Sequence, residues 1–137
     1  MKTITNKKLG NDFESEFCQM LSDEGFWVHN MAQNAAGQPA DVIAVKDKKA
    51  LLIDCKVCTR KGFVLSRIEE NQDLSMELWR ECGNGEGWFA VKTNEGVIFM
   101  LTHLSTKALR INKTVASIED LAEYGCEYRK WVKKICK

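Results

Sequence analysis

A pair of apolar runs near the middle of the chain constrains the fold more than any other feature. Asp41–Val45 and Ala50–Val57 are rich in valine, isoleucine and leucine, and they flank the polar segment Lys46-Asp-Lys-Lys49. Two short β-prone runs separated by a few turn-forming residues are typical of a β-hairpin. The sequence therefore predicts an antiparallel hairpin with its second strand ending at Val57.

The second strand of this hairpin carries two opposite charges close together, Asp54 and Lys56. Side chains alternate between the two faces of a strand, so this pair shares one face while Ile53, Cys55 and Val57 take the other. Asp41, on the first strand, could bring a second carboxylate to the same edge. Taken alone, the Asp54–Lys56 pair could also be an ordinary surface ion pair, which contributes little to stability.

The remaining elements follow from periodicity and turn residues. An amphipathic first helix is predicted from apolar residues at four-residue spacing, Leu9, Phe13, Phe17 and Leu21, and it should stop at Gly25. Further elements are predicted at Phe26–Asn30 (strand), Gly62–Leu65 (an extension of the sheet), Ser66–Cys82 (helix, Ser66 as N-cap), Trp88–Lys92 and Val97–Leu101 (hairpin), and a helical remainder in which Ser117 and Asp120 form a capping pair. The predicted order is α-β-β-β-α-β-β-α, an α/β fold around one mixed central sheet flanked by helices, in a single domain spanning residues 1–137.

Composition excludes several classes of protein. Hydrophobic residues make up 45% and charged residues 28%, as in an ordinary globular protein, and no run approaches the roughly 18 apolar residues of a membrane span. The N-terminus lacks the apolar stretch of a signal peptide, so we expect a cytoplasmic protein of a prokaryote or phage. The 6 cysteines could suggest disulfides, but in such a compartment reduced, buried thiols are expected. The net charge of +1 does not by itself indicate a nucleic-acid partner.

The grouping of two carboxylates and a lysine suits phosphodiester hydrolysis. Carboxylate oxygens bind hard cations such as Mg²⁺ and leave coordination positions open for water and phosphate. Such a cation polarises the phosphoryl group and lowers the pKa of bound water. A nearby lysine can orient that water and stabilise the charge that develops in the transition state. Asp41, Asp54 and Lys56 are therefore candidate catalytic residues.

The order of these motifs resembles the PD-(D/E)XK nuclease superfamily. The resemblance rests on a helix glutamate, Pro39-Ala-Asp41, and Asp54-Cys-Lys56 on the next strand, and it extends from about Lys7 to Leu101. More narrowly, the chain is similar to Holliday junction resolvases of the archaeal and RecU-like types, including phage relatives. One departure is Asp54, where resolvases usually carry glutamate, and a shorter carboxylate could alter the metal preference or geometry.

The resemblance implies a role for residues from three segments. It matches Gly10 and Glu14 to a Gly-x-x-x-Glu pattern on the first helix, although periodicity alone does not choose between Glu14 and Glu16. It matches Gln72 to a glutamine of the second helix, and a glutamine on a core-facing stripe must find hydrogen-bond partners, either in the active site or at a backbone carbonyl. The implied metal ligands are Glu14, Asp41, Asp54 and the Cys55 backbone carbonyl.

Other residues are weighed as DNA contacts or set aside. The candidates for phosphate or backbone contact are Lys7, Lys8, Gly10, Asn34, Gln38, Arg60 and Lys61. Cys55 and Cys58 form a C-x-x-C pair, but no second pair follows, which argues against zinc. The tryptophans Trp27, Trp79 and Trp88 are predicted to lie in the core, and His29 and His103 look isolated.

The function implied by the resemblance is Mg²⁺-dependent cleavage of branched DNA, with Mn²⁺ able to substitute and Holliday junctions as the expected substrate. Resolution of a junction needs two symmetric cuts, so a homodimer is expected. Two alternatives stay open on the residues alone. One is another nuclease of the superfamily, restriction-like or engaged in replication and repair, and the other is a non-catalytic DNA-binding module of the same fold.

Overall fold

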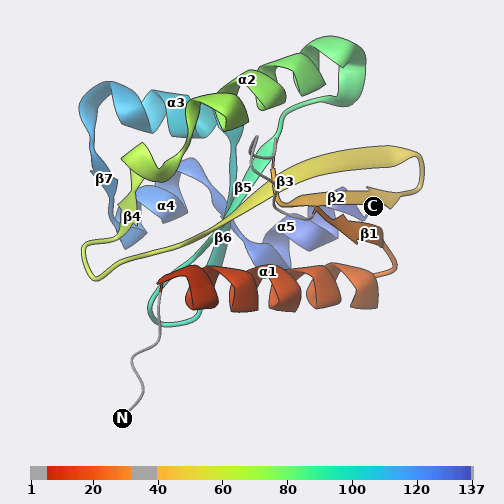
Figure 1. The fold of residues 1–137 in the computed structure, drawn as a ribbon, viewed down its shortest axis with the longest axis horizontal. Helices are drawn as coiled ribbons and strands as arrows, with labels where there is room; N and C mark the ends of the chain where they lie inside the picture. Colours follow the sequence, from red (N-terminus) through yellow and green to blue (C-terminus); the bar gives the residue numbers. More distant parts are fainter. Residues whose placement is uncertain (1–5, 32–39, 137) are drawn as a thin grey trace.

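The computed structural model describes residues 6–31 and 40–136 and shows a six-stranded sheet between two layers of helices (Figure 1). The larger helices are α1 (Asn6–Asp23), α2 (Glu70–Trp79), α3 (His103–Asn112), α4 (Ile118–Tyr124) and α5 (Tyr128–Ile135). The strands are β1 (Trp27–Asn30), β2 (Val42–Lys46), β3 (Lys49–Val57), β4 (Phe63–Val64), β5 (Trp88–Lys92), β6 (Ile98–Thr102), β7 (Val115–Ala116) and β8 (Cys126–Glu127). Within the described ranges, no helix combines the length and apolar character needed to cross a lipid bilayer.

The central sheet is mixed, as the sequence predicts. Its strand order is β1-β2-β3-β5-β6-β8, and only the β3–β5 pair in this order is parallel. The β2–β3 hairpin turns at Asp47 and Lys48, both with positive φ, which gives a tight connection between the strands. Strand β3 therefore lies inside the sheet with neighbours on both sides, and Asp54 on it is removed from solvent.

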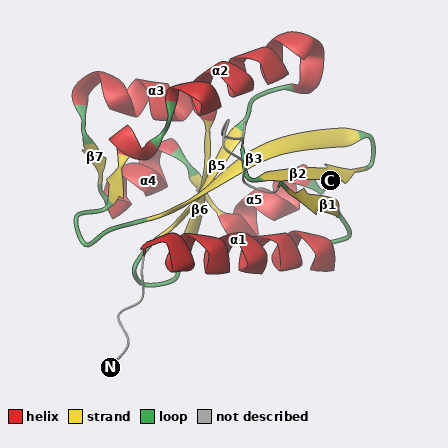
Figure 2. Cartoon of the chain, in the orientation of Figure 1, coloured by secondary structure: helices red, strands yellow, loops and turns green. Residues whose placement is uncertain are grey.

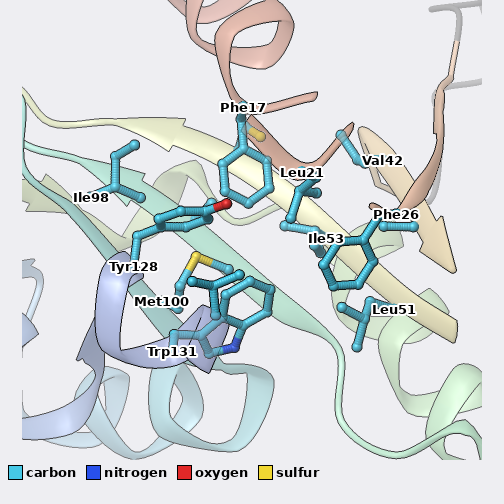
Figure 3. Close-up of a cluster of buried hydrophobic side chains, with 14 of the residues drawn as sticks. Phe17, Leu21, Phe26, Val42, Leu51, Ile53, Ile98, Met100, Tyr128 and Trp131 are labelled. Atoms are coloured by element: carbon cyan, nitrogen blue, oxygen red, sulfur yellow. The ribbon is translucent and has the colours of Figure 1, made fainter. Parts of the chain in front are cut away.

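Two apolar clusters cover the two faces of this sheet. On one face, α1 buries the stripe Phe13, Phe17 and Leu21 together with Tyr128 and Trp131 of α5 (Figure 3). On the other face, α2, α3 and α4 cover a second cluster that includes Met76, Phe89 and Leu121. Helices lie on both sides of the central sheet (Figure 2), and the α/β fold class predicted from the sequence is confirmed.

Contrary to the prediction from the sequence, the segment Gly62–Leu65 does not extend the central sheet but pairs with a different strand. Phe63 and Val64 form β4, which pairs with β7 in a separate two-stranded sheet instead of extending the central one. Gly62 has φ of +122°, and its backbone lies against the Ala116 carbonyl. This close approach between distant segments leaves no local pattern in the sequence.

The second helix begins later than predicted. Leu65–Arg67 forms a 3₁₀ turn, and Ile68 is extended, so α2 starts at Glu70 with Glu69, not Ser66, as its N-cap. Ile68 is buried, and burying it in this extended conformation interrupts the helix. The helix also ends at Trp79, and the following turn, Arg80–Asn84, is of the wider π type.

Side-chain burial corrects one prediction and agrees with two others. Trp27 is 62% exposed and does not belong to the core, because it lies on an edge strand. Trp79 and Trp88 are partly buried against the two clusters. All 6 cysteines are free thiols, but the prediction that they are buried holds only for Cys55 and Cys58, and Cys82 is exposed.

Candidate active site

Asp54 and Lys56 form a buried ion pair on β3. The Lys56 Nζ lies 3.0 Å from Asp54 Oδ2, and the Asp54 side chain is 1% exposed. Both residues face the α2 side of the sheet, because they alternate with Ile53 and Cys55, which pack under α1. A buried carboxylate is costly unless paired, so this pair is not an ordinary surface salt bridge.

Gln72 completes a triangle with this pair. Its Nε2 donates to Asp54 Oδ1 at 3.1 Å, and its Oε1 accepts from Lys56 Nζ at 3.2 Å. The same Oε1 accepts from the backbone N–H of Glu69 at 3.0 Å, at the start of α2. Gln72 thus joins the helix N-terminus to both charged groups and explains how a buried glutamine is satisfied.

Asp41 lies just before β2 and links the strand pair to the first helix. Its side chain is buried, and Oδ2 accepts from the Cys55 backbone N–H at 2.8 Å. Asp41 is also within side-chain hydrogen-bonding reach of Glu14 and Asp54. Because the N–H and C=O of one strand residue point to the same side, the Cys55 carbonyl faces the edge where Asp41 lies.

The structure separates Glu14 from Glu16, which periodicity alone leaves equivalent. Glu14 is half-buried beside Asp41. Glu16 instead pairs with Lys92 at 2.9 Å on the surface. Of the two glutamates, Glu14 is the one that joins the carboxylate cluster.

This crowding changes the acidity of the cluster. Burial, together with the nearby charge of Asp41, raises the pKa of Glu14 to about 7, against the opposing effect of Lys56. Burial also raises the pKa of Asp54 well above its ordinary value, with the Asp41 carboxylate adding to the effect. Carboxylates that repel one another in a buried site are relieved when a cation binds.

The donor set fits a divalent cation in its chemistry. Asp54 Oδ2 is buried and meets the Lys56 ammonium at 3.0 Å without good hydrogen-bond geometry, so it has acceptor capacity left for a cation. Among those residues, no three acidic, histidine or cysteine side chains already enclose a position for an ion. Glu14, Asp41 and Asp54 would therefore have to turn toward a bound cation, while the oxygen ligands themselves are those that Mg²⁺ or Mn²⁺ prefers.

The predicted DNA contacts are distributed unevenly. Lys8 is exposed on α1, and its Nζ lies 3.3 Å from Asp12 Oδ2. Gly10 has no neighbouring atom within 4 Å of the position that a Cβ would take. Arg60 and Lys61 are exposed in the turn that follows β3. Asn34, Gln38 and the side chain of Lys7 fall outside the residues that the structure describes.

Sequence reasoning missed the contacts that join the turn before α2 to β3 and α3 to α2. The Arg67 carbonyl accepts from Lys56 Nζ at 3.0 Å, and Arg67 Nη1 donates to the Val57 carbonyl at 3.3 Å. His103, which looks isolated in sequence, is buried and lies 2.7 Å from Asp73, next to Gln72. Arg110 also binds Asp73, at 2.7 and 2.8 Å. Neither the Arg67 carbonyl contact nor the group of Asp73, His103 and Arg110 leaves a short-range pattern, so no sequence signal reveals them.

The raised pKa of Glu14 gives a testable expectation for metal-free protein. Because the folded pKa of Glu14, about 7, exceeds its ordinary value of 4.5, its contribution to stability is present below pH 4.5 and is lost as pH rises toward 7. In the presence of chelator, the Tm of Glu14→Gln minus the Tm of the wild type should therefore increase as the pH rises from 4.5 to 7. Glu16→Gln is the control, since its carboxylate lies against Lys92, and an equal gain there would contradict the expectation.

Comparison with known proteins identifies the family. The sequence pattern of the archaeal Holliday junction resolvase family (Hjc) matches residues 5–130. The fold is similar to that of Hjc, a Holliday junction resolvase from the archaeal hyperthermophile Archaeoglobus fulgidus, with a TM-score of 0.67 and 18% sequence identity over 90% of this chain and 99% of that one. No curated protein sequence matches. Since the family pattern spans nearly the whole chain and the fold agrees with it, this chain belongs to the archaeal Holliday junction resolvase family of nucleases.

Proposed function

We propose that this chain cleaves four-way DNA junctions by Mg²⁺-dependent hydrolysis at the cluster of Glu14, Asp41, Asp54, Lys56 and Gln72. The observation that carries the proposal is the buried triangle of Asp54, Lys56 and Gln72 beside Asp41. Membership of the resolvase family supplies the substrate class, and nucleases of this family generally use divalent metal ions. Mn²⁺ should substitute for Mg²⁺, because both accept carboxylate ligands.

The residues divide the chemistry among them. Glu14, Asp41 and Asp54, with the Cys55 carbonyl, would hold the cation, which when bound activates water and polarises the phosphate. Lys56 holds its ammonium 3.0 Å from Asp54, where it can orient the attacking water and stabilise the negative charge of the transition state. Gln72 keeps Lys56 and Asp54 in position through hydrogen bonds to both.

Substrate contacts are proposed around this cluster. The exposed residues Lys8, Arg60 and Lys61 can neutralise phosphates, and Lys7, Asn34 and Gln38, which lie outside the described part of the chain, are proposed as further DNA contacts. Gly10 lies one helical turn before Glu14, and no neighbouring atom occupies the position of an added Cβ. Its internal surroundings therefore do not require glycine, which leaves close approach of the DNA backbone as the reason for it.

Symmetric resolution calls for two copies of the site. A junction is resolved by cuts in two opposed strands, and one site makes one cut. A homodimer with twofold symmetry places two equivalent sites on the related strands. We therefore propose that the active species is a homodimer.

A cleavage assay tests the proposal. Purified protein with Mg²⁺ should nick a four-way junction in opposed strands, and chelator should remove the activity, because the carboxylates alone supply no Lewis acid. Linear duplex, single strands and flaps of matched sequence serve as the comparison substrates, and light scattering reports the mass. Preferential cleavage of a linear substrate would contradict the junction proposal and leave only a nuclease.

A further inference from the structure

Two aromatic rings form an exposed stack on the edge strand β1. The rings of Trp27 and His29 are nearly parallel, with an interplanar angle of 11° and centroids 6.1 Å apart. Trp27 is 62% exposed, and His29 is also exposed. A single exposed aromatic residue is unremarkable, whereas two parallel exposed rings can continue their stack with a further planar group.

The strand register places this stack on the same sheet face as the catalytic pair. His29 lies opposite Ile43, and Ile43 lies opposite Leu52. Leu52 shares its face with Asp54 and Lys56, because side chains on one face recur every second residue. The intervening Val28 points the other way and packs under α1. The aromatic pair therefore lies on the same face of the sheet as Asp54 and Lys56.

The separation is that of a few nucleotides. Strand β1 is two strands away from β3, and Leu52 precedes Asp54 by two residues. Strand spacings of about 4.8 Å and a rise of about 3.3 Å per residue then put His29 roughly 12 Å from Asp54. A DNA strand with its phosphate at the cluster would have nearby bases within reach of the two rings.

We propose that Trp27 and His29 form a stacking platform for nucleobases at the branch point of the junction. This inference rests on the proposed function, since it assigns a second contact to the same substrate. Base stacking is interrupted at a branch point, so the base pairs that flank it each have one uncovered face. An aromatic ring can stack on that face. Stacking on aromatic side chains tolerates every base, as a structure-selective enzyme requires. A linear duplex has no such uncovered face in its interior.

Binding measurements without metal test the platform apart from cleavage. Trp27→Ala should weaken binding to a four-way junction by about ten-fold, since one lost base–aromatic stack has an effect of this order. Trp27→Phe should restore most of the affinity. Affinity for a linear duplex whose two ends are closed by hairpin loops should change little in either variant. Tyr124→Ala, an exposed aromatic residue on α4, is the matched control and should bind as the wild type does.

The outcomes separate this inference from the function on which it rests. If the wild type binds and cleaves the junction while Trp27→Ala binds it equally well, the platform is wrong and the nuclease stands. If the wild type does not bind a junction, both fail. If Trp27→Ala instead changes the mass measured by light scattering, the ring pair contacts a second protein copy and the proposal is overturned. His29→Ala provides a second variant on the same platform, with the same expected direction.

Discussion

Asp54→Asn should reduce the cleavage rate of a four-way junction by roughly 10³-fold or more while the protein stays folded. Asp54 is the most buried carboxylate of the cluster, and its Oδ2 has acceptor capacity left beside the Lys56 ammonium. An amide at this position removes the negative charge that would attract the cation and that holds Lys56 at 3.0 Å. Single-turnover cleavage with saturating protein measures the chemical step apart from binding.

Two controls make this result specific. Asp47→Asn makes the same chemical change on the same hairpin, but Asp47 is exposed at the turn with positive φ, which asparagine tolerates. Its cleavage rate should match that of the wild type. Circular dichroism and junction binding without metal should show that Asp54→Asn is folded and still binds. Retention of more than a tenth of the wild-type rate would remove Asp54 from the catalytic cluster.

Gly62→Ala should give the largest loss of stability among simple glycine substitutions. A Cβ at this position would stand 2.3 Å from the Ala116 carbonyl oxygen, and φ of +122° is unfavourable for an L side chain. The β4–β7 pair would have to separate, or the turn after β3 would have to shift. Backbone strain costs about 1–3 kcal/mol, and an unrelieved clash adds a similar amount.

Gly96→Ala separates the clash from the strain. Gly96 also has positive φ, at +86°, but no neighbouring atom lies within 4 Å of the added Cβ. Urea unfolding should show that Gly62→Ala lowers the free energy of unfolding by about 2 kcal/mol more than Gly96→Ala does. Equal losses in the two variants would mean that the contact with Ala116 relaxes without cost.

The catalytic strand and its acidic partners were predictable because their signals are local. Alternation along Ala50–Val57 places Asp54 and Lys56 on one face, and the turn residues between the two runs predict the hairpin that brings Asp41 near them. The first helix follows equally well from its four-residue repeat. Each of these patterns depends on residues close together in the chain, where backbone geometry alone determines which side chains meet.

Contacts between distant segments were not predictable. The choice of Glu14 over Glu16 depends on Asp41 lying under one side of α1 and Lys92 under the other. The late start of α2 depends on burying Ile68 in an extended conformation, and the exposure of Trp27 depends on β1 being at the edge of the sheet. Tertiary packing decides such matters because it can override local preference by burying one side chain and exposing another.

The sequence by itself determined the chemistry of this protein: an apolar hairpin that ends in Asp54-Cys-Lys56, with a carboxylate on its first strand. Only the tertiary structure decided that Asp54 is fully buried, that Gln72 bridges it to Lys56, and that crowding raises the pKa of Glu14 to about 7. The reason is physical. Residue type and spacing determine which groups a strand presents, whereas burial and the mutual distances of charges, which control acidity and ion binding, arise only when α1, β3 and α2 pack together.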